Sequence, residues 1–548
     1  MPPEDDQLPE RKRAFKPKVR TGCITCKCVR SGRQCEGYEL PKSLVILPRA
    51  LAPAPTVESP LETRALELFF HKTAPQLAGY FEGPLFQGSV VQISLVEPAI
   101  RHAIAAVAML HEEISASPAT REGKSQASKL PIQLYNRSIR GIIDKVQAGP
   151  TAMPLIAMAN ILFICFEYFQ GNVTMARSHV KSGIHLLHSW RERTHGSSTS
   201  MHPWGQRYDS FESQFMEMQI APLLSVFRTN ILDKDMAKAI KLVLNPVNEQ
   251  GNVILGDHFS SPQQARVGLL DVITYASWRI QAVDEALLGK VEAKKEVMRI
   301  MQNMEQGLGQ WESYFNDLVR RKGVSWGKKD RQAANVVRII KLAGSFGGRS
   351  YLAGNECAWD SARAEYEEML LIAEALIADR DRFPHDGFRP LSLDFGMLFS
   401  LHLLAWKCRW PGLRRRGLDL LQKIPRREWS LEVEHYHTIF SRIMEIEEAH
   451  LDTPRDEIVR LDMLPPEHAR VHDFTVIAQP SSSRQPAIYA VSFWSKPLGL
   501  DGPSSSLTEY MQLGSSQAGE SGVPASLITA APSSLITQYY SYLRQLKG

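Results

Sequence analysis

The 548-residue sequence has only seven cysteines, no acidic residue between positions 11 and 35, and no long uninterrupted apolar run. Seven cysteines are too few for a disulfide-stabilised scaffold of this length, so we expect reduced thiols. The N-terminus lacks the apolar segment that a secretory signal requires. The longest apolar stretch, 153–169, contains Asn160 and Glu167, and we interpret it as a buried helix rather than a bilayer span. These absences predict a soluble, intracellular protein that does not use a membrane.

The charges are divided unevenly along the chain. Residues 11–35 carry nine Lys and Arg, and the remaining 55 basic and 59 acidic residues give the rest a net charge of −4. Hydrophobic residues make up 44% and charged residues 22%, an ordinary globular composition. A short cationic segment on a faintly acidic body is typical of a protein that binds a polyanion at one end.

Changes in composition and periodicity predict six segments. Apolar residues recur at helical spacing almost throughout the central part, whereas five prolines and no heptad pattern mark the stretch before it. That proline content excludes a coiled-coil dimerisation helix directly after the cysteines. The segments are a disordered start (1–10), a basic, cysteine-bearing arm (11–38), a Pro-rich linker (39–60), a large α-helical domain (61–452), an extension with a β-hairpin (453–498) and a mostly disordered tail (499–548).

The expected fold is therefore mainly α, with a small C-terminal β-hairpin. Residues 470–479 and 487–496 are rich in Val, Ile, Phe, Tyr and Trp and are separated by a Pro- and Ser-rich turn, which predicts two paired strands. Gly171 and Asn172 separate two helical patterns and predict a helical hairpin. Helices are expected at 98–114, 152–170, 173–193, 262–288, 291–320, 331–352, 357–379, 392–408, 412–423 and 430–450.

Four cysteines lie within thirteen residues, which is the densest group in the chain: Cys23, Cys26, Cys28 and Cys35. Four thiolates suffice for one tetrahedral zinc ion. The single residue between Cys26 and Cys28 is a tight spacer for two ligands of one ion. We therefore expect at most one zinc per chain, and the alternative is four free thiols.

The arm, from Arg11 to Tyr38, resembles the six-cysteine binuclear zinc cluster of fungal transcription factors. Cys23 and Cys26 match the first pair of the family pattern, and Cys28 and Cys35 match its fifth and sixth cysteines. A segment of about fifteen residues that would contain the third and fourth cysteines is absent, because Lys27 is followed directly by Cys28. A splicing event, a misplaced exon boundary or a genomic deletion would each produce this junction. The intact family motif holds two zinc ions, and these four cysteines cannot.

The resemblance assigns roles to the basic residues of the arm. It implies contacts with promoter DNA for Lys18, Arg20, Lys27, Arg30 and Arg33. Only Lys27 remains of the helix that contacts bases in the family. The run of Arg11, Lys12, Arg13 and Lys16 is typical of nuclear localisation or phosphate contact.

The body resembles the fungal-specific transcription factor regulatory domain over about 60–497. The segments that carry this resemblance are 97–112, 163–172, 176–187, 407–421 and 425–429. It implies a nuclear regulator of RNA polymerase II genes, specific for a pathway or gene cluster, with the transcription machinery as partner and a possible homodimer through the helical domain. The alternative is an interaction protein that keeps the helical domain but does not recognise DNA sequence.

An enzyme is not expected. The sequence contains no HExxH pair, phosphate-binding loop, dinucleotide fingerprint or nucleophile elbow. His179, His185 and His188 lie at helical spacing but have no acidic partner at a metal-site spacing. We interpret them as ordinary helix histidines.

Overall fold

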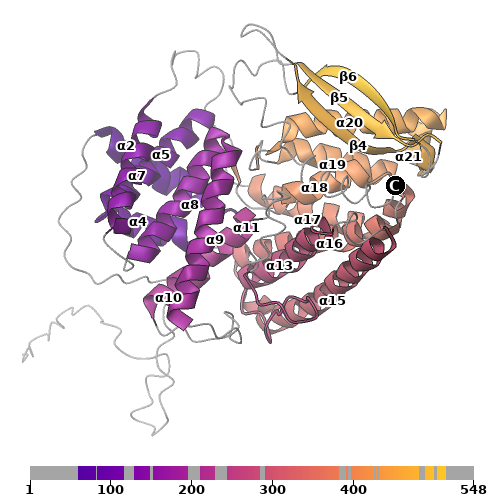
Figure 1. Ribbon diagram of the computed structural model, residues 1–548. Helices are drawn as coiled ribbons and strands as arrows, with labels where there is room; N and C mark the ends of the chain where they lie inside the picture. The colour runs from indigo at the N-terminus through magenta and orange to yellow at the C-terminus, as the bar shows by residue number, and fades with distance from the viewer. Residues whose placement is uncertain are drawn as a thin grey trace, which may run out of the picture. The chain divides into compact units, whose positions relative to one another are not determined.

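The computed structural model divides the chain into a short unit, Met1–Ala50, and a compact unit, Leu51–Gly548, of which only the second is described here. Secondary structure within it runs from Pro60 to Gln512 (Figure 1). The described residues are 60–81, 83–115, 129–147, 152–195, 210–228, 244–283, 290–353, 355–381, 391–392, 397–424, 427–428, 431–479, 488–498 and 503–513.

The N-terminal half of this unit is a group of helices around the apolar helices α5 and α8. Helix α5 packs against α2, α7 and α8, and α8 packs against α9. Three short π-helical segments interrupt this half, at Phe69–Thr73, Leu85–Ser89 and Met216–Ile220. The α-helices are α2 (Pro60–Leu68), α3 (Ala74–Ala78), α4 (Val90–Ser94), α5 (Pro98–Ser115), α7 (Leu130–Gln147), α8 (Met153–Gln170), α9 (Val173–His195), α10 (Phe211–Phe215) and α11 (Ala221–Arg228).

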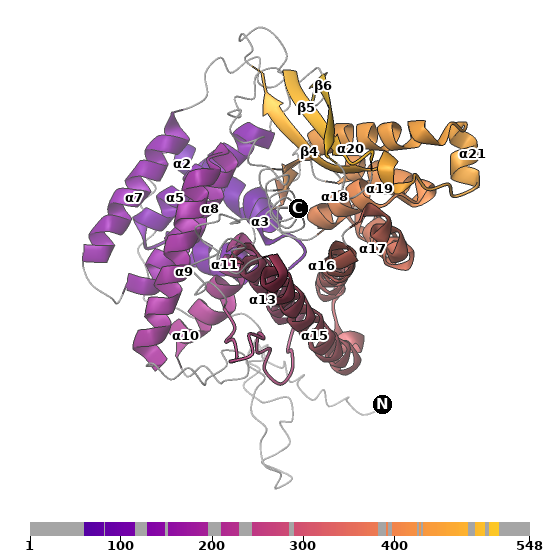
Figure 2. The same cartoon turned by 45° about the vertical axis from the view of Figure 1, so that its right-hand side comes forward.

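The C-terminal half continues with longer helices and ends in a sheet, as Figure 2 shows from a second side. Helix α13 packs against α15 and α16, and α16 packs against α17 and α18. The predicted start of α13 is confirmed: Ser261 caps the helix by accepting the Gln264 N–H, and Pro262 is its first residue. The helices are α13 (Pro262–Gln281), α15 (Lys290–Lys322), α16 (Lys328–Ala353), α17 (Arg363–Asp381), α18 (Met397–Lys407), α19 (Pro411–Lys423), α20 (Val433–Glu448) and α21 (Arg455–Arg460).

The predicted hairpin is confirmed and is part of a larger sheet. Strands β4 (Val471–Ala478) and β5 (Ile488–Ser495) pair antiparallel, with Phe474 opposite Phe493. A third strand, β6 (Ser505–Gln512), pairs antiparallel with β5 over its whole length. The prediction of a mostly disordered tail from 499 is therefore wrong for residues 505–512. A smaller sheet joins the two-residue strands β1 (Leu391–Ser392), β2 (Arg427–Glu428) and β3 (Leu431–Glu432).

The sheet uses one face to extend the hydrophobic core. Phe474, Val491 and Phe493 are buried, whereas Ile488 and Trp494 on the other face are exposed. The ring of Phe474 lies edge-on to the rings of Trp406 in α18 and Phe440 in α20. The alternation follows the two-residue period of a strand. Aromatic packing thus joins the sheet to the helices beneath it.

Helix α8 is almost entirely buried. By its length and composition alone this helix could cross a membrane, but 72% of the apolar stretch Met153–Gln170 is buried inside the protein. Core helices of soluble proteins can have the same length and apolar composition. This burial agrees with the interpretation of 153–169 as a core helix.

The α8–α9 hairpin is built as the sequence predicted. Gly171 follows α8 with φ of 78°, a left-handed conformation that a side chain disfavours, and the next N–H, of Asn172, donates to the Glu167 carbonyl. Asn160 of α8 donates from Nδ2 to the His179 carbonyl of α9 at 2.9 Å. Hydrogen bonds therefore close the turn between the two helices and connect them again between Asn160 and His179.

Gly183 is the point of closest packing in this hairpin. A Cβ atom there would overlap Asn160 Oδ1 and lie 2.8 Å from Leu224 Cδ2 of α11. Glycine at this position lets α9 approach both helices at once. By contrast, a Cβ at Gly309, inside α15, would meet nothing within 4 Å.

These two glycines give opposite expectations for alanine. Gly183→Ala should destabilise the domain by about 1–3 kcal/mol, because the added methyl forces α8, α9 and α11 apart. Gly309→Ala should stabilise it by about 0.5–1 kcal/mol through helix propensity alone. Urea unfolding followed by circular dichroism measures both. Equal effects in the two variants would contradict the packing described for Gly183.

Candidate functional site

The sequence-predicted site residues all precede the described part of the chain. The metal candidates Cys23, Cys26, Cys28 and Cys35 lie in the unit Met1–Ala50. The same holds for the DNA-contact candidates Lys18, Arg20, Lys27, Arg30 and Arg33, and for the localisation candidates Arg11, Lys12, Arg13 and Lys16. The structure brings together a different set of residues, namely charged and polar side chains buried inside the helical unit.

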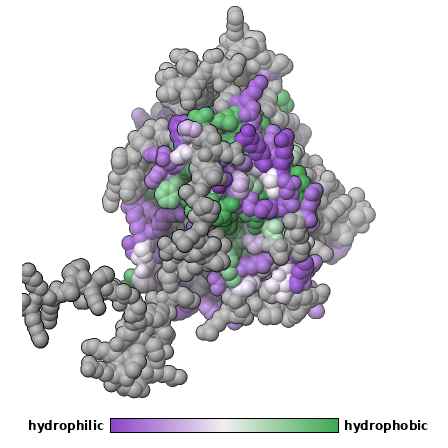
Figure 3. All heavy atoms as spheres, turned by 90° about the vertical axis from the view of Figure 1, so that its left-hand side faces the viewer, coloured by the Kyte–Doolittle hydropathy of each residue, from purple (hydrophilic) through white to green (hydrophobic). Residues whose placement is uncertain are grey.

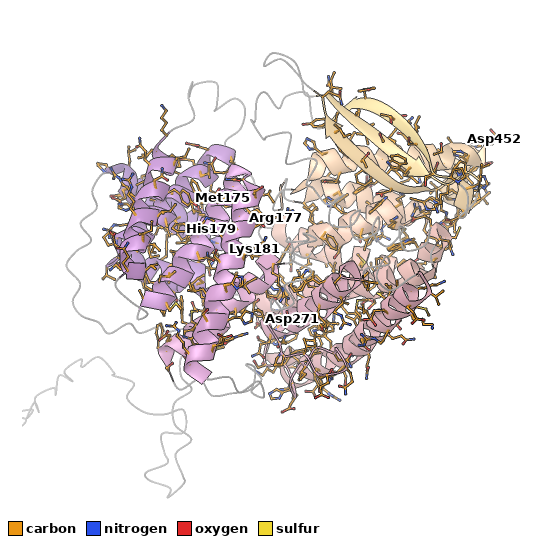
Figure 4. All side chains as sticks on the ribbon, in the orientation of Figure 1. Met175, Arg177, His179, Lys181, Asp271 and Asp452 are labelled. Atoms are coloured by element: carbon orange, nitrogen blue, oxygen red, sulfur yellow. The ribbon has the colours of Figure 1, made fainter. Side chains whose placement is uncertain are left out.

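His179 belongs to the first buried polar group, which lies between α7, α8 and α9 (Figure 4). Tyr135 donates its hydroxyl to Glu167 Oε1 at 2.7 Å, and its oxygen lies 3.1 Å from His179 Nε2. Burial raises the pKa of Glu167 and lowers the pKa of His179. The tyrosine ring stacks on Phe166. This group fixes the packing of three helices with side chains that burial drives toward their neutral forms.

A second buried group joins α11 to α13. Arg228 and Asp271 form an ion pair whose side chains are both 0% exposed. The other carboxylate oxygen of Asp271 accepts the backbone N–H of Asn245 at 2.8 Å and its side-chain amide at 2.6 Å. Figure 4 shows Asp271 on α13. Since an isolated buried carboxylate is strongly disfavoured, these donors are what make the position tolerable.

The largest group centres on Glu447 near the end of α20. Its carboxylate is 0% exposed and binds Arg409 Nη2 at 2.8 Å and Arg414 Nη1 at 2.6 Å. The same carboxylate accepts the backbone N–H of Val471, the first residue of β4, at 2.8 Å. Burial alone would raise the pKa of Glu447, but the two guanidinium groups outweigh it and lower that pKa. Glu447 is therefore a buried carboxylate held in its ionised form.

Two further ion pairs extend this group toward the 3₁₀ helix Glu356–Ala362. Lys407 Nζ lies 2.9 Å from both carboxylate oxygens of Glu356 and donates to the His472 carbonyl at 3.2 Å. Arg470 forms a two-bonded pair with Asp360, at 2.7 and 2.9 Å. We call the seven side chains of these pairs the buried ion cluster: Glu356, Asp360, Lys407, Arg409, Arg414, Glu447 and Arg470.

The buried ion cluster attaches β4 to four helical elements. Its charged side chains come from α18, α19, α20, the 3₁₀ helix and the segments beside them, and they satisfy main-chain groups of Val471 and His472 as well as one another. Fully paired charges of this kind hold one geometry, because any shift leaves an ion without a partner. The cluster fixes where the sheet lies on the helices.

The fourth and last group of interest is the set of cysteines in the helical unit. Burial raises the pKa of Cys357 to about 11 and that of Cys408 to about 12, and it also raises the pKa of Cys165. These thiols are therefore protonated at neutral pH and poor nucleophiles. Within the ranges that the structure describes, no three His, Cys, Asp or Glu side chains gather as a metal site would require.

The buried ion cluster was not predicted from the sequence. In the sequence, 407–421 carries only a resemblance to a family. Its three consecutive arginines, Arg414–Arg416, look like a charged run exposed to solvent. In the structure, Arg414 is buried in the cluster, whereas Arg415 and Arg416 pair with Glu448 and Glu374 nearer the surface. One feature of the sequence indicated this burial: Arg409 and Arg414 closely follow the apolar segment 397–406.

Glu447→Gln should destabilise the helical unit by about 3–5 kcal/mol, because two buried guanidinium groups lose their shared counter-charge. Glu445→Gln on the same helix is the matched control. Glu445 pairs with Arg442 at 2.9 Å, but both side chains are well exposed, at 44% and 38%. The control should cost less than about 1 kcal/mol. Chemical unfolding of both variants decides, and a loss for Glu447→Gln no larger than the control would contradict the role given to the cluster.

Comparison with known proteins shows that part of this unit is similar to a known family. Residues 65–318 match the fungal specific transcription factor domain. The matched region runs from α2 to the end of α15 and includes the first two buried polar groups, whereas the buried ion cluster lies beyond it.

A curated relative gives the same indication. The transcription regulator lscL of Purpureocillium lilacinum is 25% identical over 189 residues, which cover 30% of this chain and 45% of that protein. The aligned region thus spans less than half the length of the relative. No solved structure matches the chain. The family description and the name of the relative both point to transcription regulation, a role that is normally not enzymatic. Residues 65–318 of this chain are therefore similar to the fungal specific transcription factor domain.

Proposed function

We propose that this chain is a nuclear transcription regulator that binds promoter DNA through its basic arm and controls RNA polymerase II genes of one pathway or gene cluster. The observation that carries the proposal is the match of residues 65–318 to the fungal specific transcription factor domain. The name of the relative supports it. The uneven charge supports the DNA partner, because nine basic residues and no acidic residue lie between positions 11 and 35.

In this proposal the helical unit is the regulatory part, and its contact is with the transcription machinery. Its described cysteines offer no reactive thiol, and buried ion pairs such as Arg409–Glu447 hold its elements together. A protein of this kind acts by binding, and its rigidity keeps the binding surfaces in a fixed arrangement.

Zinc in the arm would be held by Cys23, Cys26, Cys28 and Cys35. Four thiolates do not fit the two-zinc cluster of the family, which needs six cysteines and two bridging thiolates. We propose at most one zinc ion per chain, which would order the arm around the remaining cysteines. Native mass spectrometry of a peptide covering residues 10–45 measures the stoichiometry, and two zinc ions per peptide would contradict this assignment.

A homodimer through the helical domain is part of the proposal. Helix α7 exposes Ile132, Ile143 and Val146, and Ile139 beside them is only partly buried. Figure 3 faces this side of the unit, where hydrophobic and hydrophilic residues are mixed on the surface. Such an apolar stripe suits packing against a second helix. Sedimentation velocity of the full chain at micromolar concentration tests this, and a purely monomeric protein would contradict it.

The missing middle of the zinc cluster favours a second candidate, an interaction protein that keeps the helical domain without recognising DNA sequence. Only Lys27 remains of the residues that contact bases in the family, and phosphate contacts position a protein without specifying sequence. The two candidates differ in the ratio of specific to non-specific DNA affinity. A regulator that selects promoters by itself needs a high ratio, and an interaction protein needs none.

A competition binding assay with the full chain at physiological salt measures this ratio. One base contact of the Lys27 kind is worth about 1–3 kcal/mol, and about 1.4 kcal/mol is a factor of ten, so the preference for CGG-type triplets over scrambled duplex should be roughly 100-fold at most. Replacing Arg11, Lys12 and Arg13 by Ala should weaken binding to both duplexes equally, because these residues contact phosphates. The same variant should move a fluorescent fusion from nucleus to cytoplasm.

A thousandfold preference would show that another part of the chain contacts bases. No measurable binding to either duplex would contradict the DNA-binding proposal and favour the interaction protein. Substitution of Lys294 and Lys295, two exposed lysines of α15 outside the arm, by Gln is a control that removes two charges where the arm variant removes three.

A further inference from the structure

The turn between α15 and α16 gathers the densest group of cations in the described part of the chain. Six of the twelve residues from 320 to 331 are basic, and one is acidic. The 3₁₀ turn Gly323–Ser325 connects the two helices. We call these six residues the basic turn: Arg320, Arg321, Lys322, Lys328, Lys329 and Arg331.

Carboxylates neutralise only part of this charge. Arg320 and Arg321 share one carboxylate, that of Asp317. Lys328 lies 3.6 Å from Asp379. Counting Asp317, Asp330 and Asp379 against the six cations leaves a net of three positive charges.

Three of the cations have no carboxylate partner among the described residues: Lys322, Lys329 and Arg331. Lys322 donates to the Ser260 carbonyl at 2.9 Å, and Arg331 donates to the Trp326 carbonyl. A carbonyl orients a cation but does not cancel its charge. Lys322 and Arg331 are therefore held in place while their positive charge remains available to a ligand.

The basic turn is also open to solvent. Val324 at its tip is fully exposed, and a Cβ at Gly327 would meet nothing within 4 Å. The side chain of Arg320 is 77% exposed. Helices α15 and α16 extend from the turn as the long rods seen in Figure 1. An extended anionic polymer can therefore reach the turn, because the residues at the tip of the turn do not block its approach.

Helix stability does not account for all of this charge. Cations in the last turn of α15 are favourable, because the C-terminal end of a helix carries partial negative charge. Lys328 and Lys329 are the first two residues of α16, where the helix carries partial positive charge, and there cations are unfavourable. Residues that oppose a local preference are candidates for function.

We propose that the basic turn binds the phosphate backbone of the DNA duplex that the N-terminal arm binds. This inference rests on the proposed DNA-binding function. A duplex presents a regular row of phosphates, and each cation that neutralises one releases a counterion. Contacts with phosphates position a protein without specifying sequence, so we expect the turn to add affinity without sequence preference.

A fixed surface suits DNA better than a nuclear import receptor. Basic clusters serve either role in general. Here Arg320–Lys322 and Lys328–Arg331 belong to two helices, so their backbone is helical and not extended. The cluster is therefore an array of side chains on folded helices rather than an extended peptide.

The experiment measures how the affinity of the full chain for a duplex of about 20 base pairs depends on salt, by fluorescence anisotropy. The variant is Lys328→Gln with Lys329→Gln. Loss of two phosphate contacts should reduce the slope of log affinity against log salt by about 1.8. Thermal stability should stay the same or rise, because the variant removes cations from the positive end of α16. A stability loss with an unchanged slope would mean a structural role and would overturn the proposal.

The matched control is Lys294→Gln with Lys295→Gln, which removes the same charge from exposed positions at the other end of α15. At 1.5 Å per residue the two ends of this 33-residue helix are about 50 Å apart. The control should leave the slope within about 0.5 of the parent chain, since non-contacting charges release few counterions. An equal drop in both variants would mean a general charge effect and would overturn the assignment to the turn.

Substitution of Arg11, Lys12 and Arg13 by Ala separates this inference from the function on which it rests. If the arm variant lowers the slope and the basic-turn variant does not, the basic turn does not bind DNA and the proposed function stands. If neither variant changes the slope, DNA binding by this chain is itself wrong. If the basic-turn variant keeps its slope but leaves the nucleus as a fluorescent fusion, the turn binds an import receptor instead.

Discussion

The C-terminal half of the helical unit depends on one buried carboxylate. Glu447 binds two guanidinium groups and the first N–H of β4, all within 2.8 Å. Each partner comes from a different element, so the contact specifies where α19, α20 and the sheet meet. A hydrophobic contact in its place would tolerate sliding, whereas charges taken out of water are stable only in the geometry that pairs them. The order of this half follows from that requirement.

The N-terminal half is held by close helix packing and by smaller polar groups. Gly183 allows α8, α9 and α11 to approach one another, and Asn160 bridges α8 and α9 by a hydrogen bond. The ion pair of Arg228 and Asp271 then joins α11 to α13. The match to the fungal specific transcription factor domain ends at residue 318, inside α15, so the buried ion cluster supports a part of the chain that follows the matched region. A rigid support is what a protein that acts by binding requires.

Local patterns in the sequence were sufficient for much of the fold. The α8–α9 hairpin, the start of α13 and the pairing of β4 with β5 follow from turn residues and periodicity, which act over a few residues. Strand β6 was missed because Ser505 and Ser506 begin it in a stretch rich in Ser, Gly and Pro. Its pairing depends on β5 and on the ion pair of Arg442 with Glu509. No local pattern carries that information.

The same limit applies to the candidate sites. Glu447 and Arg409 are 38 residues apart, and each alone has the appearance of an ordinary surface charge on a helix pattern. Burial of both could be predicted only from the tertiary fold. The arm is the opposite case, since four cysteines and nine cations in 25 residues are evident in the sequence, but they lie outside the described residues. The helical unit therefore supports the proposed regulator through its family, and the arm supports it through its charge.

Chromatin occupancy of the full chain tests the proposed role most directly. A tagged copy expressed from its own promoter would be cross-linked to DNA, and the bound fragments sequenced. Transcript levels would be compared with and without the gene. The account predicts occupancy upstream of a set of genes whose transcripts change when the gene is removed. Absence of the protein from chromatin at every gene that responds would contradict a DNA-binding regulator.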